Sequence, residues 1–169
     1  MKRHLIAAPL AALMLLAAAP SLAKSKIKKP WTNYFAPFYG FSMKVPKGTK
    51  FKEKEWKNGW AGVHANYWGV QLWGVAHKGV KHTVPQFQVF GMIVTGIPGK
   101  KWKLVEEGKG TNGFEWFKVH QAKHGKHVVF ALYGVGKKGS YMLVLKTTNK
   151  SFKRDKEQYL RWYKSINAS

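Results

Sequence analysis

Alternation of apolar and polar residues runs through most of the chain and predicts β-strands in both of its halves. In Phe41–Val45 every second residue is apolar, and the pattern stops at Pro46 and Gly48. This period of two is typical of a strand with one buried face. The other segments that we expect to form strands are Trp60–Trp68, Val70–His77, Lys101–Glu107, Phe114–Ala122, His127–Val135 and Tyr141–Thr147.

Two segments have the spacing of a helix instead. In Val84–Ile97, Thr83 can cap the first turn, and Phe87 and Phe90 fall on one helical face. The β-branched residues of this segment would also suit a strand, but we expect a helix. The segment Ser151–Ile166 predicts a C-terminal helix with an apolar stripe that can cover a sheet. The residues of that stripe are Phe152, Tyr159, Tyr163 and Ile166.

The last four expected strands are joined by connections that contain glycine, which predicts tight turns and an antiparallel meander. A two-residue turn after Lys123 would place Phe117 opposite Leu132. A two-residue turn after Gly136 would place Leu132 opposite Leu143. Both hairpins then turn the apolar side chains of the shared strand to one face, as a sheet register requires. We therefore expect an α/β fold of the α+β type, in which helices cover an antiparallel meander sheet.

The N-terminus has the pattern of a secretory signal peptide. Met1–His4 is basic, Leu5–Ala18 is apolar, and Ala19–Ala23 ends in the small-x-small pattern that signal peptidase cleaves. The apolar stretch is shorter than the roughly 20 residues that span a bilayer, so a membrane anchor is the less favoured interpretation. We expect cleavage after Ala23, a basic lead-in at residues 24–33 and a single α/β domain at residues 34–169. The mature protein would be periplasmic or secreted, without a further transmembrane segment.

Tyr39–Gly48 reads as an aromatic strand that ends in Pro-x-Gly, and Ser140–Leu145 reads as a strand before an aromatic helix that ends at Tyr163–Ile166. These segments resemble the opening strand and the last strand and helix of the PsbP-like family, which includes an extrinsic subunit of the photosynthetic oxygen-evolving complex and small exported bacterial proteins. The expected order of three strands, a helix, a four-strand meander and a final helix is similar too. The resemblance covers most of residues 34–166 and implies an α/β/α sandwich with an accessory or binding role. It implies no particular functional residue.

Charge determines the kind of partner that the protein can attract. The 169 residues include 30 Lys and Arg against 7 Asp and Glu, a net charge of +23, and removal of the signal peptide takes away only Lys2 and Arg3. Such a field favours anionic partners, either an envelope component such as an acidic glycan or a lipid headgroup, or an acidic protein. We expect no sequence-specific nucleic-acid binding, because lysine greatly outnumbers arginine, the residue that reads bases and phosphates with paired hydrogen bonds. The sequence leaves the oligomeric state open.

Candidate catalytic chemistry is scarce. The chain has no cysteine, which excludes thiol nucleophiles and disulfides, and it has no nucleophile elbow, Walker loop or dinucleotide-binding glycine motif. Glu106 and Glu115, near one hairpin end, are a candidate carboxylate pair for hydrolysis of an acidic polymer. The cluster of His120, His124 and His127 has a metal-like spacing, but neighbouring lysines disfavour a cation there. We expect no enzyme, no metal site and no cofactor.

One basic surface stands out from the general positive charge. Alternate turns of a meander fall at the same end of the sheet, and the cations gathered there are Lys100, Lys101, Lys123, His124 and Lys126, with Lys150 as a further candidate. On one sheet face, Trp116 opposite Tyr133 would form an aromatic floor. The cations expected on that face are Lys103, Lys118, His120 and Lys146. Such a surface suits an anionic glycan or a lipid headgroup, unless the helix expected at Val84–Ile97 covers it.

Two functions of different class are consistent with these features. The first is an exported, non-catalytic binding or accessory protein of the cell envelope with an anionic partner. The second treats the charge as an adaptation to an acidic environment, because a chain with few carboxylates loses little stability when acid protonates them. A partner that stays bound at raised salt would favour the first function, and a domain that stays folded at low pH would favour the second.

Overall fold

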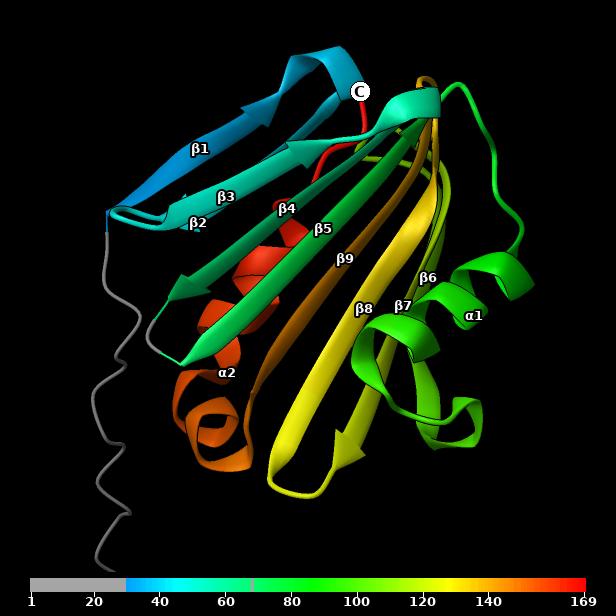
Figure 1. The fold of residues 1–169 in the computed structure, drawn as a ribbon. Coiled ribbons are helices and arrows are strands. Elements are labelled where there is room, and N and C mark those ends of the chain that lie inside the picture. Colours follow the sequence, from blue (N-terminus) through cyan, green and yellow to red (C-terminus); the bar gives the residue numbers. More distant parts are fainter. Residues whose placement is uncertain (1–29, 68) are drawn as a thin grey trace, which may run out of the picture.

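A seven-stranded antiparallel sheet forms the middle layer of the protein (Figure 1). The structure, a computed structural model, describes residues 30–67 and 69–169, so the predicted signal peptide and most of the basic lead-in lie outside the described residues. In spatial order the strands are β3 Lys50–Glu55, β4 Trp60–Tyr67, β5 Val70–Lys78, β9 Gly139–Thr148, β8 His127–Gly136, β7 Phe114–His124 and β6 Trp102–Thr111. Because β9 pairs with β5, the first three strands and the last four form one sheet.

Both faces of the sheet are covered. On one face lies α1, Val84–Thr95 (Figure 1). The other face carries α2, Asn149–Lys164, together with a two-stranded hairpin of β1, Trp31–Ala36, and β2, Phe41–Pro46. Three short 3-10 turns connect these elements: η1 Pro37–Tyr39, η2 Lys57–Gly59 and η3 Gly99–Lys101. The α/β/α arrangement predicted from the sequence is therefore present, with a hairpin added to one outer layer.

Strand alternation decides which of two apolar cores each side chain enters. In β8, Phe130 and Leu132 belong to the core under α2 and the hairpin, whereas Val129 and Ala131 belong to the core under α1. Nearly every residue of β8 and β9 is buried, because both of their faces are covered.

The structure contains two strands that the apolar pattern did not indicate. β3 has the sequence KFKEKE, in which lysine alternates with phenylalanine and glutamate, so no apolar period marks it. β1 begins inside the segment that we interpreted as a loose basic lead-in, and residues 31–33 form its first half. Five strands therefore precede α1, not three. The segment Val84–Ile97, whose residues also suited a strand, does contain the expected helix, α1. Thr83 and Gln86 form a reciprocal capping box at its start.

The register of the meander agrees with the prediction in one hairpin and differs by two residues in the other. Leu132 pairs with Leu143, as expected. On its other side Leu132 pairs with Val119 instead of Phe117, because the β7–β8 turn lies at residues 125–126 and not at 124–125. A shift of two residues leaves the side chains of β7 and β8 on their predicted faces.

The C-terminal helix is held to the sheet by aromatic side chains. Of its predicted stripe, Tyr159 and Tyr163 are buried and Phe152 is half-buried against the same core, whereas Ile166 is buried but lies two residues beyond the end of the helix. Trp162 joins them with no exposed surface, and its ring meets that of Trp31 edge to face at a centroid distance of 5.9 Å. This contact fastens the hairpin layer to α2.

Replacing Trp162 by alanine should lower the free energy of unfolding by about 3–5 kcal/mol, the usual cost of removing a fully buried aromatic side chain. Urea unfolding followed by far-UV circular dichroism measures this loss. Lys164→Ala, at an exposed position of the same helix, is the control and should change the stability by less than about 0.5 kcal/mol. A loss below about 1 kcal/mol in W162A would contradict the anchoring role.

Candidate functional site

The cations predicted to share one end of the sheet do lie together, and we term this group the basic end. Trp102 of β6 pairs with Ala122 of β7, which brings η3 beside the end of β7. At the β7–β8 turn the backbone N–H of Asn149 donates to the carbonyl oxygen of Lys126 over 2.8 Å, so the start of α2 lies there too. The basic end comprises Lys100, Lys101, Lys123, His124, Lys126 and Lys150, all exposed.

No carboxylate lies within the segments that form the basic end. Neither η3 nor residues 123–126 and 149–150 contain Asp or Glu. Acidic side chains elsewhere take part in the ion pairs Lys81–Glu115, Lys118–Glu107 and Arg154–Asp155. The positive charge of the basic end is therefore not neutralised from within its own segments.

The aromatic floor predicted from Trp116 and Tyr133 is not an open surface. The register places Trp116 opposite Val135, and Tyr133 lies opposite Lys118. Tyr133 is only 2% exposed because α1 lies over it, and the ring of Phe87 stacks on its ring at a centroid distance of 5.0 Å. Of the two arrangements that the sequence left open, the structure has the one in which α1 covers the sheet face of Trp116 and Tyr133.

The lysines expected beside the floor do not form a rim around it. Lys103 pairs with Gln121 and so lies on the α2 side of the sheet, opposite to its predicted face. Lys118 is held in an ion pair by Glu107. Lys146 does lie on the α1 side, but it is half-buried beside Gln71 of β5. These three lysines therefore contribute little to a binding surface on this face.

His120 is enclosed beneath α1. Its ring stacks on that of Tyr133 with centroids 5.4 Å apart, and its Nδ1 has no hydrogen-bond partner among the described residues. Together with Gln88 and Met92 of α1 it lines a cavity of about 170 Å³. Burial, followed by the charge of Lys118, lowers the pKa of His120, so its ring is neutral near pH 7.

Glu106 and Glu115 do not face each other as a carboxylate pair. Glu106 lies opposite Val119 and accepts a hydrogen bond from the Tyr163 hydroxyl, 2.7 Å away. Burial and this hydrogen bond raise the pKa of Tyr163. Glu115 instead binds Lys81 over 2.5 Å. The two residues proposed for hydrolysis therefore have separate partners.

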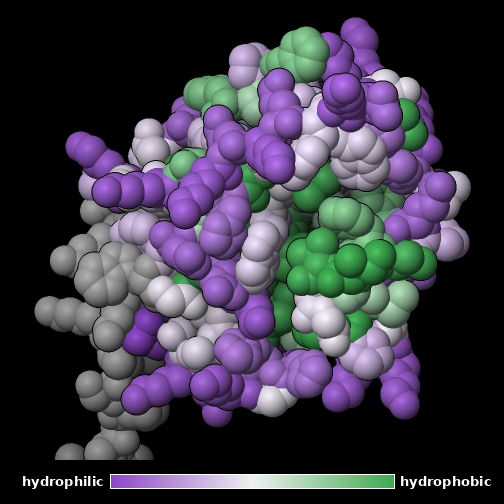
Figure 2. All heavy atoms as spheres, viewed as in Figure 1, coloured by the Kyte–Doolittle hydropathy of each residue, from purple (hydrophilic) through white to green (hydrophobic). Residues whose placement is uncertain are grey.

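α1 exposes apolar side chains next to the basic end. Val89 is 52% exposed and Ile93 is 73% exposed, and Figure 2 shows hydrophobic surface over this helix above a hydrophilic lower edge. η3 packs back on the last turn of α1: a Cβ atom added to Gly99 would lie 3.3 Å from the sulfur of Met92. A helix that is apolar on both its buried and exposed sides is unusual at a surface. The spacing of Phe87 and Phe90 predicted the buried face of this helix, but it did not predict that the exposed face is apolar too.

Comparison with solved structures identifies the fold. The solution structure of cyanobacterial PsbP (CyanoP) from Synechocystis sp. PCC 6803 aligns with 89% of this chain and 100% of that chain, with a TM-score of 0.56 and 10% sequence identity. The chain has the PsbP-like fold. No protein-family model and no curated protein matches the sequence.

The PsbP-like fold confirms, at the level of fold, the resemblance found in the sequence. Its opening motif Tyr39–Gly48 spans the end of η1, β2 and the following turn, and Ser140–Leu145 lies in β9. A crystal structure from Bacteroides thetaiotaomicron VPI-5482 aligns with 81% of this chain and 48% of that chain, with a TM-score of 0.43 and 14% identity. At 10% identity, the similarity to cyanobacterial PsbP concerns architecture alone.

Within residues 30–67 and 69–169, no helix is long and apolar enough to cross a membrane, and no group of three or more His, Asp or Glu side chains is placed to hold a metal ion. The predicted histidine cluster is separated along the sheet. His124 and His127 pair across the β7–β8 turn, whereas His120 lies four residues back along β7, about 13 Å away at the usual rise of a strand.

Three half-buried histidines should make the stability of this protein sensitive to acid. Burial is the largest cause that lowers the pKa of His82, His120 and His127, and neighbouring cations lower it further. A lowered folded-state pKa contributes stability above the unfolded value of about 6.5, and that stability is lost as the pH falls below it.

The free energy of unfolding should therefore be smaller at about pH 5 than at about pH 7.5, on either side of the unfolded histidine pKa. His120→Phe keeps the ring contact with Tyr133 and should reduce this difference, because it removes a group that the folded state holds neutral. Urea unfolding at the two pH values measures the effect. The exposed His124→Asn is the control. Equal stability at both pH values, or the same loss in H120F, would contradict the prediction.

Proposed function

We propose that this PsbP-like protein is an exported, non-catalytic binding protein of the cell envelope that contacts anionic lipid headgroups through its basic end. The observation that carries the proposal is the basic end itself, with five lysines and one histidine exposed on three separate parts of the chain and no carboxylate in those segments. A lysine close to an anionic membrane contributes about 1 kcal/mol of binding free energy. Several lysines at one end therefore favour one orientation on such a surface.

The exposed face of α1 supports a lipid surface over an acidic glycan or an acidic protein. Ile93 lies in the last turn of α1, beside the segment that carries Lys100 and Lys101. Apolar side chains that enter the headgroup region, flanked by lysines that meet the phosphates, are typical of peripheral membrane binding. The predominance of lysine fits this mode, because a hydrated point charge serves a surface of many headgroups without a fixed geometry.

Acid adaptation is the alternative explanation of the charge, and the half-buried histidines argue against it. His82, His120 and His127 favour the neutral form in the folded state, and acid would charge them where solvent is scarce. A domain selected for acid would gain from exposing such groups. The proposal of export rests on the Met1–Ala23 sequence pattern, which lies outside the described residues.

The purified protein should bind vesicles that contain phosphatidylglycerol and should not bind vesicles of phosphatidylcholine alone. The triple variant K100Q/K101Q/K123Q should bind the anionic vesicles about 100-fold more weakly, at about 1 kcal/mol per lysine. Ile93→Ser should reduce the binding that survives about 300 mM salt, where exposed charges are strongly screened. Vesicle sedimentation over a salt series measures both effects.

A matched control separates the basic end from the general positive charge. K47Q/K50Q/K52Q removes the same charge from exposed positions at the β2–β3 turn and on β3, and it should weaken vesicle binding less than about tenfold. Equal losses of vesicle affinity in the two triple variants would show that only the total positive charge matters and that the basic end is no specific site. Retention by an acidic polysaccharide at higher salt than by the vesicles would make the partner a glycan instead.

A further inference from the structure

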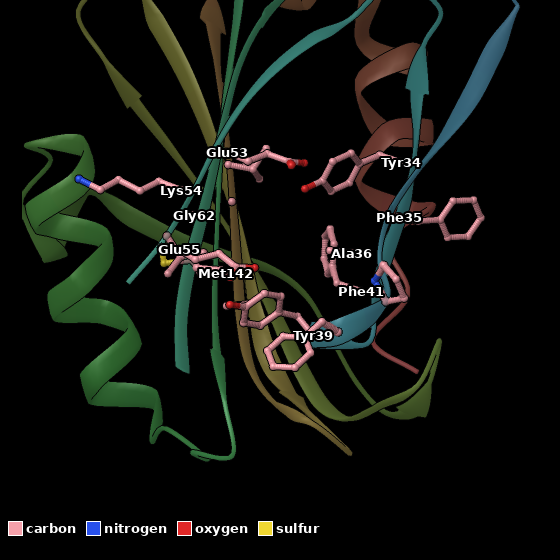
Figure 3. Close-up of a pocket in the computed structure, with 17 residues that line it drawn as sticks. Tyr34, Phe35, Ala36, Tyr39, Phe41, Glu53, Lys54, Glu55, Gly62 and Met142 are labelled. Atoms are coloured by element: carbon pink, nitrogen blue, oxygen red, sulfur yellow. The ribbon is translucent and has the colours of Figure 1, made fainter. Parts of the chain in front are cut away.

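A cavity opens on the hairpin side of the sheet, away from the basic end, and we term it the hairpin cleft (Figure 3). β1, η1 and the start of β2 form one wall, and β3, β4 and β5 form the other. Its volume is about 410 Å³, which lies within the range of roughly 300–1,000 Å³ found for small-molecule sites. The sequence did not indicate it, because β1 and β3 were both absent from the expected elements.

The cleft is hollow because small residues occupy the sheet beneath the hairpin. Ala61 pairs with Ala76, and Gly74 lies two residues before Ala76 on the same face of β5, opposite Val63. A Cβ atom on Gly74 would come within 2.6 Å of the Val63 side chain, so a larger residue does not fit there. The side chains of the hairpin do not fill the space that these residues leave.

β3 separates its charges by face and turns its acidic face to the cleft. Successive side chains of a strand point to opposite faces, so Glu53 and Glu55 share the face of Phe51, which packs on the core beneath the hairpin. The lysines of β3 lie on the opposite face; Lys54 also borders the cavity, but Figure 3 shows its side chain directed away from the two glutamates. Figure 3 shows Glu53 directed toward Tyr34 and Glu55 directed toward Tyr39. Two of the seven acidic residues of the chain thus stand two positions apart at this cavity.

Each of these glutamates has a tyrosine partner across the cleft. Burial, followed by a hydrogen bond to Glu53, raises the pKa of Tyr34. Burial, followed by the charge of Glu55 and a hydrogen bond to it, raises the pKa of Tyr39. Both hydroxyls therefore keep their protons and donate to the carboxylates. Since a carboxylate has about four acceptor positions, each glutamate retains further acceptor positions for a ligand.

We propose that the hairpin cleft binds an amphiphilic amine, with the apolar body between hairpin and sheet and the ammonium group against Glu53 and Glu55. The net charge of +23 repels cations in general, so a cation would bind only where local carboxylates outweigh that field. The walls suit an apolar body, because most of the lining residues are aromatic or aliphatic. The site lies on a different side from the basic end, and the proposal does not depend on lipid binding.

The rim of the cleft already holds an ammonium against an aromatic ring. The Nζ of Lys78 lies 3.2 Å from the ring centroid of Phe38, a cation–π contact. Phe38 is 59% exposed and belongs to the lining of the cleft. An amine in the cleft would meet the carboxylates of Glu53 and Glu55 beside other aromatic lining residues such as Tyr34 and Phe41. Carboxylates and aromatic ring faces are the two groups that recognise organic ammonium ions in proteins.

Calorimetric titration with naphthylethylamine and with its neutral analogue naphthylethanol tests the proposal. The amine should bind at least tenfold more tightly than the alcohol, a difference of about 1.4 kcal/mol. In E53Q/E55Q this preference should disappear while binding of the alcohol is retained. E107Q/E157Q removes the same charge from two exposed glutamates outside the cleft and should keep the preference.

Two further measurements keep the test decisive if the double variant is unstable. Ala36→Phe fills the cleft from β1 and should abolish binding of both compounds. In the unaltered protein, the methyl resonances of Ala36, Ala61 and Ala76 should shift during titration with the amine, whereas that of Ala131 under α1 should not. Absence of amine binding, equal affinity for amine and alcohol, a preference that persists in E53Q/E55Q, or unchanged binding in A36F would each overturn the proposal.

Discussion

Hydrogen bonding between β5 and β9 joins the two halves of the chain into one sheet, and every outer layer is placed by this pairing. The ladder runs from Gln71 opposite Lys146 to Lys78 opposite Gly139. At Gly139 the strands approach so closely that a Cβ atom would lie 2.2 Å from the carbonyl oxygen of His77, so the position requires glycine. Such long-range pairing must overcome the entropy of closing a long loop. The burial of β9 on both faces supplies the apolar stabilisation that offsets this cost.

Covering both faces of one sheet gives the protein two sides with different chemistry. On the α1 side, exposed aliphatic residues of the helix lie next to η3, which contributes two lysines to the basic end. On the hairpin side, Glu53 and Glu55 face a cavity with mostly apolar walls. β3 shows the separation most clearly, because its lysines and glutamates alternate and so fall on opposite faces. A strongly basic protein thereby keeps a local acidic site.

The parts of the fold that could be predicted are those with a strong local pattern. The strands that form the meander alternate clearly, and their glycine turns left only a two-residue uncertainty in register, as the pairing of Leu132 with Val119 shows. The C-terminal helix was recognisable from its aromatic stripe. β3 was not recognisable, because an edge strand of charged residues has no apolar period. β1 was not recognisable either, because its pairing with β2 depends on residues brought back by η1.

The sequence by itself determined the strong positive charge, the lack of cysteine chemistry, the α+β class and the gathering of cations at one end of the meander, because these depend on composition and on short-range periodicity. Tertiary structure alone decided that α1 covers Tyr133, that Lys118 is bound by Glu107, and that Glu106 and Glu115 have separate partners. It alone also created the hairpin cleft. These features arise where elements distant in the chain pack against each other, and a periodic pattern records which face of an element is buried but not which element covers it.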